Sequence, residues 1–108
     1  MSKTEAAYQA KLMDRLQALF PTAFIIRTDP HEYQGIPDIL LLVGDRWAML
    51  EVKMSETSPV QPNQPYYVSM FNRMSFASFI YPENEEEVLR DLQSSLGPRR
   101  QTRLSESV

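Results

Sequence analysis

Two short apolar runs separated by Gly44-Asp45 form the clearest pattern in the chain. Residues 39–43 and 47–52 each have the length and the residue types of a β-strand. A glycine at the first central position of a two-residue loop favours a type II′ turn, which joins antiparallel strands. The pattern therefore predicts a β-hairpin, and because both of its faces are apolar, it predicts strands that are covered on both sides.

The register of this hairpin follows from the length of its turn. A two-residue loop pairs Val43 with Arg46. Counting outward from that pair places Asp38 directly opposite Glu51, at a Cβ separation of about 4.5–5.5 Å. Strand alternation places Lys53 on the same face as Glu51 and diagonal to Asp38. The sequence therefore predicts that two carboxylates and an ammonium group converge.

Opposed carboxylates in apolar strands are costly unless something neutralises their charge. A divalent cation is the simplest partner, because hard cations such as Mg²⁺ prefer oxygen ligands and keep several waters. Asp38, Glu51 and a backbone carbonyl would leave positions for a phosphate and a nucleophilic water, which phosphodiester hydrolysis needs. Lys53 would bind the phosphate, orient the water or offset charge in the transition state, three roles that the sequence does not separate.

A purely structural interpretation of the same residues stays open. In that interpretation Asp38 caps a turn beside Pro37, while Glu51 and Lys53 form a partly exposed charge cluster on an edge strand. We prefer the catalytic interpretation. A purely structural origin would require that the residue types, their spacing and their common face of the sheet all coincide by chance.

Periodicity predicts further elements on both sides of the hairpin. Helices are expected over residues 3–20, 64–74 and 84–96, and strands over residues 23–28 and 75–81. This order predicts an α/β fold in which a central mixed sheet is flanked by helices. A capping box, Asn84-x-x-Glu87, is expected to open the last helix.

Composition limits the chain to a small globular protein without thiol chemistry. It has 108 residues, 43% of them hydrophobic, and no cysteine, which excludes disulfides and thiolate zinc sites. Residues 1–96 are expected to form one domain, and residues 97–108 a flexible tail with too few apolar groups to order itself. The longest apolar run, residues 39–43, is far shorter than the roughly 20 residues of a membrane helix, and no signal peptide is visible. A cytoplasmic protein is therefore expected.

The formal net charge of −3 is unfavourable for a nucleic-acid enzyme, because phosphate contacts dominate affinity for nucleic acids. Part of this negative charge belongs to the proposed metal site, where a bound cation would reverse the local field. Net charge therefore does not exclude a nucleic-acid substrate, but weak binding to generic linear DNA is expected.

The residues of the hairpin resemble a known family. Pro37-Asp38, twelve intervening residues and Glu51-Val-Lys53 resemble the core motif of the PD-(D/E)XK nuclease superfamily. Together with Gly35-Ile36, this motif is most similar to the small VRR-NUC branch of the superfamily. The resemblance extends over most of residues 4–96. It implies a restriction-endonuclease-like fold and a nuclease that depends on Mg²⁺ or Mn²⁺.

The resemblance also implies roles for individual residues. Asp38, Glu51 and the backbone carbonyl of Val52 would bind the metal, and Lys53 would position the phosphate and the attacking water. Related nucleases carry an acid on an early helix that leans toward the metal, which makes Glu5 a candidate direct or indirect ligand.

Two of these assignments have alternatives. Ser2-x-x-Glu5 is equally a capping-box signature, so Glu5 is either a ligand, a cap or both. Gln64, at the start of its helix, matches a glutamine that the family places near the active site, where its amide would hold the water or a phosphate. Gln61 is a competing alignment for the same role.

The resemblance further implies a substrate and an assembly. A domain this small has little surface for reading bases, so recognition of DNA shape is expected. Minimal VRR-NUC proteins from phages and bacteria resemble resolvases of Holliday junctions, and two symmetric cuts need two active sites, which implies a homodimer. The alternatives are another nuclease of the superfamily, such as a nickase, a flap nuclease or a homing or restriction endonuclease, and a non-catalytic DNA-binding module with the same fold.

Overall fold

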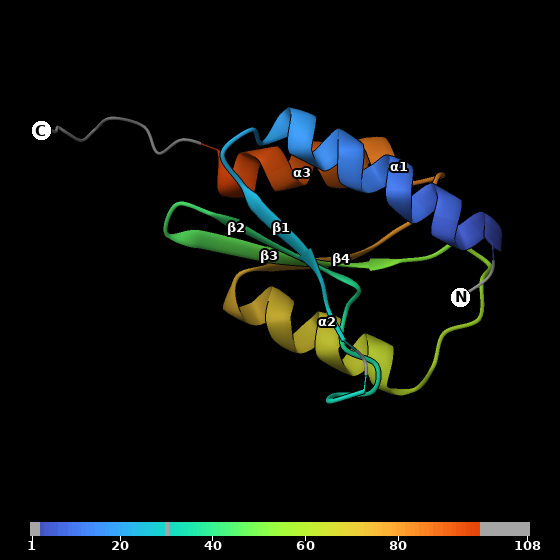
Figure 1. The fold of residues 1–108 in the computed structure, drawn as a ribbon. Helices are drawn as coiled ribbons and strands as arrows, with labels where there is room; N and C mark the ends of the chain where they lie inside the picture. The colour runs from blue at the N-terminus through green and yellow to red at the C-terminus, as the bar shows by residue number, and fades with distance from the viewer. Residues whose placement is uncertain (1–2, 30, 98–108) are drawn as a thin grey trace, which may run out of the picture.

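Helices and strands follow one another in the predicted order. The computed structural model describes residues 3–29 and 31–97 of the chain (Figure 1). The elements are α1 (Lys3–Leu19), β1 (Phe24–Arg27), β2 (Ile39–Val43), β3 (Arg46–Val52), α2 (Asn63–Met74), β4 (Phe76–Ile80) and α3 (Glu85–Leu96). Every element end lies within one residue of its prediction, because each boundary coincides with a change in hydrophobic period or with a turn-forming residue.

The four strands form one mixed sheet in the order β1-β2-β3-β4. The pairs β1/β2 and β2/β3 are antiparallel, whereas β3 and β4 are parallel and are connected through α2. Gly44 has a φ of +61°, as the hairpin turn requires. The topology confirms the predicted α/β fold, a mixed sheet flanked by helices with the restriction-endonuclease-like architecture.

The hydrophobic core lies between the sheet and the helices α1 and α3. Figure 1 shows both helices on one face of the sheet and α2 on the other. Leu12 and Leu16 from α1 meet Leu41 and Leu50 from the hairpin, and Leu92 from α3 completes this fully buried group. Burying a leucine side chain stabilises the fold by roughly 1.5–3 kcal/mol. This layer holds the hairpin rigidly from one side.

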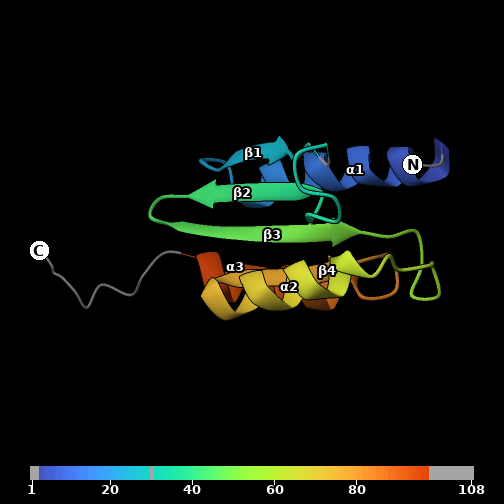
Figure 2. The same cartoon turned by 90° about the horizontal axis from the view of Figure 1, so that it is seen from below.

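The opposite face of the sheet is only partly covered. Figure 2 shows α2 along the β4 side of the sheet, with β1 and β2 left open. Over the covered part, the ring of Phe71 packs edge-on against Trp47 at a centroid distance of 6.0 Å. On the open part, Phe24 is 63% and Leu42 is 41% exposed. The prediction that the hairpin is covered on both sides is therefore wrong for β2, because α2 is too far from this strand to cover it.

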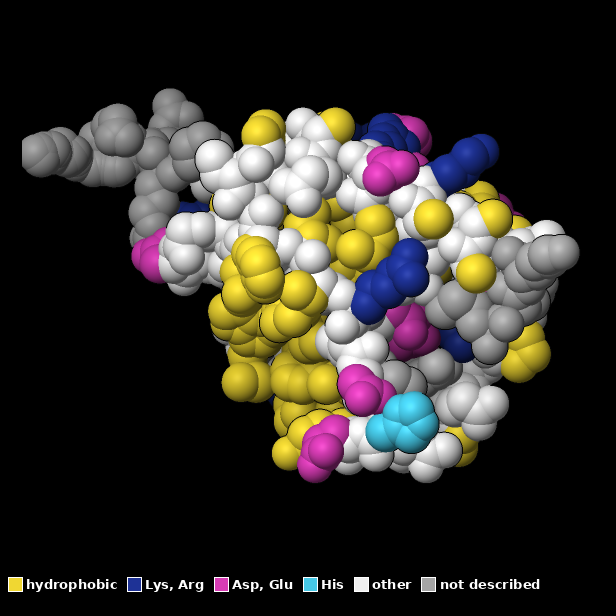
Figure 3. Space-filling view, viewed as in Figure 1, with side chains coloured by type: hydrophobic (Ala, Val, Ile, Leu, Met, Phe, Trp, Pro, Cys, Tyr) yellow, Lys and Arg dark blue, Asp and Glu magenta, His cyan; other side chains and the backbone are white. Residues whose placement is uncertain are grey.

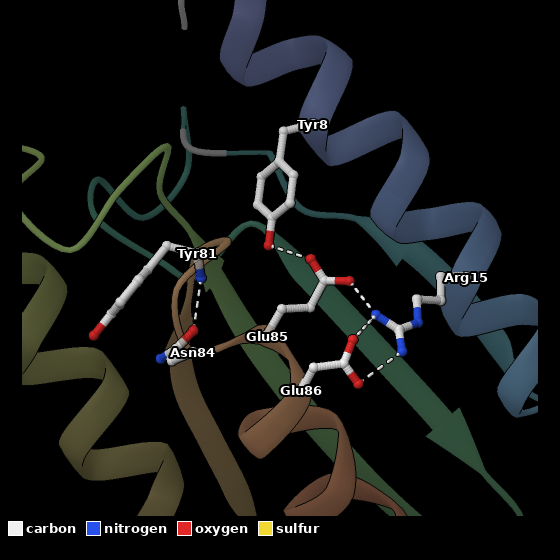
Figure 4. Close-up of polar contacts among 6 residues, drawn as sticks. All are labelled: Tyr8, Arg15, Tyr81, Asn84, Glu85 and Glu86. Atoms are coloured by element: carbon white, nitrogen blue, oxygen red, sulfur yellow. Dashed lines mark hydrogen bonds and ion pairs between the residues drawn. The ribbon is translucent and has the colours of Figure 1, made fainter.

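A polar cluster joins the two helices of the core layer (Figure 4). The Tyr8 hydroxyl on α1 donates a hydrogen bond of 2.7 Å to Glu85 on α3. Arg15 forms ion pairs with Glu85 and Glu86, the latter at 2.9 Å. Burial, followed by the hydrogen bond to Glu85, raises the pKa of the Tyr8 hydroxyl. The first-turn acids of α3 thus interact with a partner on α1 as well as with the positive helix end.

The predicted capping box of α3 does not form. Asn84 is the residue that precedes the helix, but its side chain makes no capping hydrogen bond. Instead its Oδ1 accepts a hydrogen bond of 2.8 Å from the Tyr81 amide, and its amide group donates to the Phe79 carbonyl at 3.1 Å. The side chain therefore stabilises the turn after β4 rather than the first turn of the helix.

Some expectations lie outside the described residues. These include Ser2 of the first capping box and residues 98–108 of the expected tail. The division into a domain over residues 1–96 and a tail stays a prediction. Within residues 3–29 and 31–97, none of the helices combines the length and the apolar character that crossing a bilayer requires.

Candidate active site

The open end of the hairpin brings the two predicted acids together. The register predicted from the turn is confirmed, since Ile39 pairs with Leu50 and each inner pair follows in step. Its continuation by one residue places Asp38 opposite Glu51. The Asp38 carbonyl accepts a hydrogen bond of 2.9 Å from the Thr28 amide, so the residue is also tied to the end of β1. Backbone pairing on both sides therefore fixes the position of Asp38.

Pro37 determines which hydrogen bonds the backbone N–H and C=O groups of Val52 can form. The same register places Pro37 opposite Val52, at a position where antiparallel residues would exchange two hydrogen bonds. Proline has no N–H, so β2 offers the Val52 carbonyl no donor. The Val52 amide donates to the Asp38 carboxylate at 2.9 Å, and the Pro37 carbonyl accepts from the Thr28 hydroxyl at 2.6 Å. The Val52 carbonyl is thereby available on the side where Asp38 lies.

Glu51 is a buried acid whose two oxygens differ in their hydrogen bonding. Its side chain is 2% exposed, and Oε2 accepts a hydrogen bond of 2.9 Å from the Gln64 amide. Oε1 is buried, and no N–H or O–H group of the described residues donates to it; a hydrogen bond between the Glu51 and Asp38 carboxyl groups requires that the pair hold a proton. Buried polar atoms without a donor are rare and costly, and a bound cation would remove that cost. The donor set, two carboxylates and a backbone carbonyl, consists of the oxygen ligands that Mg²⁺ prefers.

Burial and mutual repulsion keep the acidic pair partly protonated. Burial, followed by the charge of Asp38, raises the pKa of Glu51 to about 9. Burial also raises the pKa of Asp38, although the hydrogen bond from the Val52 amide opposes this. At neutral pH one proton is therefore held by the pair, which titrates as a unit. A cation that binds both carboxylates must displace this proton.

Gln64 connects Lys53 to Glu51. The Lys53 ammonium donates to Gln64 Oε1 at 2.8 Å and to the Pro59 carbonyl at 2.9 Å. The other end of the same amide donates to Glu51, so both ends of the Gln64 side chain are engaged. Gln61 contributes only its backbone N–H, which donates to Gln64 Oε1 at 2.9 Å. Of the two competing glutamines, Gln64 is the one whose side chain hydrogen-bonds to Glu51.

Lys53 lies beside the acids without pairing directly with them. Within residues 3–29 and 31–97, no ion pair joins its ammonium group to Asp38 or Glu51. Its charge nevertheless lowers the pKa of both carboxyl groups, against the larger effect of their burial. The ammonium group is thus held at the edge of the site by neutral oxygens, which a phosphate oxygen can replace.

Gly35 has a role that the sequence pattern did not predict. It has a φ of +92°, and a Cβ atom at this position would lie only 2.5 Å from Cβ of Asn63. The Asn63 side chain in turn donates to the Gln34 carbonyl at 3.2 Å. The loop that leads to Asp38 therefore packs directly against the first turn of α2, which carries Gln64. The sequence signal for this role is the glycine in Gly-Ile-Pro-Asp, since a positive φ favours glycine.

Glu5 is the predicted site residue that lies on α1 rather than on the hairpin or α2. It is half-buried in the first turn of α1, and its charge is the smallest of the effects that raise the pKa of Glu51. In the described part of the chain, no three histidine, cysteine or acidic side chains form a group that could hold a metal. A role for Glu5 as a ligand therefore stays a prediction, whereas Asp38, Glu51, Lys53 and Gln64 form one connected group.

Comparison with known proteins finds a similar solved structure. No protein-family model matches the chain, and no curated protein matches it. Among solved structures it is similar to Hjc, a Holliday junction resolvase from the archaeal hyperthermophile Archaeoglobus fulgidus. The TM-score is 0.49 and the sequence identity is 19%, over 70% of this chain and 67% of the resolvase. The case for a function therefore depends on the residues of this chain.

Proposed function

We propose that the chain is a metal-dependent endonuclease of the PD-(D/E)XK superfamily, in its VRR-NUC branch, that hydrolyses phosphodiester bonds in DNA. The observation that carries the proposal is Oε1 of Glu51, to which no described N–H or O–H group donates, buried next to Asp38 at the end of the hairpin. Asp38, Glu51 and the Val52 carbonyl would hold Mg²⁺ or Mn²⁺, and the cation would supply Lewis-acid chemistry for activation of the attacking water.

The other residues of the site bind and orient the substrate. Lys53 exchanges its contact with the Pro59 carbonyl for a phosphate oxygen and offsets the charge that develops on the phosphate in the transition state. Gln64 keeps Lys53 and Glu51 at a fixed separation, because each end of its amide binds one of them. Burial of Glu51 keeps water away from one side of the site, which strengthens these interactions.

We infer that the substrate is branched DNA, most specifically a four-way Holliday junction. The chain is small and has a net charge of −3, so tight binding of linear DNA through many phosphates is not expected. Recognition must then use the shape or flexibility of the DNA rather than its bases. This substrate, together with action in the cytoplasm of a bacterium or of a phage-infected host, is part of the proposal.

Cleavage of matched substrates tests this function. Four-way junctions, flaps, splayed arms and linear duplexes of one sequence are incubated with the protein in Mg²⁺, in Mn²⁺ and in EDTA. We expect cuts at paired, symmetric positions in the junction, slower cutting of the linear duplex and none in EDTA. Equal cutting of all substrates would point to a different nuclease of the superfamily. A folded protein that cuts nothing in either metal would be a binding module.

We further propose that the protein is a homodimer, which would supply two active sites to one junction. Phe24, Ile26 and Leu42 form an exposed apolar group, termed here the Phe24 patch, with exposed fractions of 63%, 36% and 41%. Phe24 pairs with Leu42 across β1 and β2, so the three side chains share one face of the sheet. Figure 3 shows hydrophobic side chains gathered in this region. A contiguous apolar surface next to an edge strand suits a two-fold contact with a second copy.

Charge placed in the patch tests the dimer. Phe24→Asp is expected to convert a dimer into a folded monomer, because two like charges would face each other across the two-fold axis. Molar mass is measured by light scattering at several concentrations, and circular dichroism checks the fold. Tyr33→Ser is the matched control, since Tyr33 is 57% exposed but belongs to the loop before Asp38. A wild-type protein that stays monomeric at high concentration and on a junction would contradict the proposal.

A further inference from the structure

A hollow opens directly beside the candidate active site. It has a volume of about 410 Å³, and Lys53 belongs to its wall. Phe79 and Tyr81 line it from the β4 side, and Val60 and Pro65 line it from the loop and from α2. This volume falls within the range of about 300–1,000 Å³ found for small-molecule sites, and two of the side chains are aromatic. None of these aromatic side chains has a role in the metal site.

The register of β3 and β4 explains why the hollow adjoins the acids. The parallel pairing sets Phe79 beside Glu51, so both side chains lie on the same face of the sheet. The ladder continues past the end of β4, because the Lys53 amide donates to the Ile80 carbonyl at 2.9 Å. The next position places Tyr81 beside Lys53. Two aromatic side chains thus form a row next to the acid and the ammonium group, about 5 Å away across the strands.

The turn after β4 holds Tyr81 out of the core. Asn84 binds the Tyr81 amide and the Phe79 carbonyl, which fixes the backbone on both sides of Ile80. Figure 4 shows the ring of Tyr81 pointing away from Asn84 and from the polar cluster around Glu85. Both aromatic side chains are half-buried, and within the described residues the Tyr81 hydroxyl makes no hydrogen bond. The ring therefore keeps a face and a polar edge for a ligand.

We propose that this hollow, termed here the aromatic subsite, holds an unstacked nucleobase next to the phosphate that is cut. The inference rests on the proposed nuclease function. In a nucleotide, an aromatic base is joined through one sugar to a phosphate, which matches an aromatic hollow that shares Lys53 with the metal site. Stacking on aromatic side chains binds any base, so it requires no base-specific contacts. The protein would thereby gain affinity that its net charge of −3 does not provide.

The subsite would also select the substrate class. Moving a base out of a duplex costs free energy, and the cost is lowest where the base is mismatched, damaged or single-stranded. Where the arms of a branched structure are not coaxially stacked, the bases at its centre lose part of their stacking, whereas those within a linear duplex keep theirs. A site that requires an unstacked base at the cut therefore favours branched DNA over linear DNA without reading sequence.

Substitution of Tyr81 tests the subsite in the full chain. Tyr81→Ala is expected to lower kcat/KM for a four-way junction by about 5- to 150-fold, the range for loss of one base stack. Tyr81→Phe should stay close to wild type, and Tyr81→Leu, which keeps apolar bulk to preserve folding, should behave like Tyr81→Ala. Tyr66→Ala is the matched control, because Tyr66 is an exposed tyrosine of α2 outside the lining of the hollow.

A binding measurement separates failure of the subsite from failure of the nuclease. Junctions carrying 2-aminopurine at single positions around the branch point are bound in Ca²⁺, without turnover. We expect fluorescence at one position to change with wild-type protein and not with Tyr81→Ala. Cleavage that is insensitive to Tyr81→Ala and Tyr81→Leu, with no position-specific fluorescence change, would overturn the subsite and leave the nuclease proposal intact. A Tyr81-dependent signal without cleavage in any metal would support the subsite and overturn the nuclease.

Discussion

Asp38→Asn is expected to reduce cleavage of DNA by at least about 10²–10³-fold, the loss found when one charge-stabilising group is removed from an active site. Asparagine keeps an oxygen that can accept the hydrogen bond from the Val52 amide, so the hairpin should keep its conformation. What is lost is the negative charge needed to bind the cation beside Glu51. Initial rates on a four-way junction in Mg²⁺ measure the effect.

Asp45→Asn provides the control for this substitution, because Asp45 is an exposed aspartate in the turn at the opposite end of the same hairpin. It should cut at the wild-type rate. Calorimetric titration with Mn²⁺ supplies a readout other than activity, and binding should be lost in Asp38→Asn alone. Wild-type cleavage by Asp38→Asn would show that the activity belongs to another site or to a contaminant.

Glu51→Gln is expected to abolish cleavage and at the same time to stabilise the metal-free protein at alkaline pH. The pKa of Glu51 is raised from 4.5 to about 9, first by burial and then by the charge of Asp38. A carboxyl group with a raised pKa in the folded state contributes stability that is present below the unfolded pKa and is lost as pH rises through the folded pKa. The wild-type protein should therefore lose stability between about pH 4.5 and 9.

The stabilisation expected from Glu51→Gln at alkaline pH is large enough to measure. Glutamine removes the ionisation and keeps an oxygen that can accept from Gln64, so the gain at pH 8 should be on the order of 2–4 kcal/mol. For a domain of this size, the unfolding temperature should rise by about 8–20 °C. Scanning calorimetry in EDTA from pH 6 to 9 should show a falling Tm for the wild type and a nearly constant Tm for Glu51→Gln.

Two further measurements, one with added Mg²⁺ and one with a matched control variant, complete the test of Glu51→Gln. Mg²⁺ should raise the Tm of the wild type by mass action and leave that of Glu51→Gln unchanged. Glu56→Gln, which alters an exposed acid in the loop after β3, should retain the wild-type pH dependence. An identical fall in Tm for wild type and Glu51→Gln would mean that the buried pair does not bind the extra proton.

The sequence by itself determined the hairpin and everything that depends on its register. The turn at Gly44 and the alternation of side chains are local properties of the backbone, so they fix which residues oppose each other. Counting residues outward from the turn is enough to place Asp38 opposite Glu51 and to place Lys53 on the same face of the sheet. The remaining helices and strands were equally predictable, since their periods change at glycine, proline or asparagine.

Only the tertiary structure decided how the hairpin is covered and what surrounds the acids. The choice of Gln64 over Gln61, the close packing at Gly35 and the aromatic row at Phe79 and Tyr81 all depend on where α2 and β4 dock. The same docking leaves the Phe24 patch exposed, although its residues look like buried strand positions. Strand pairing is set by neighbouring residues, whereas docking depends on the packing of distant side chains, and no local pattern along the chain encodes that packing.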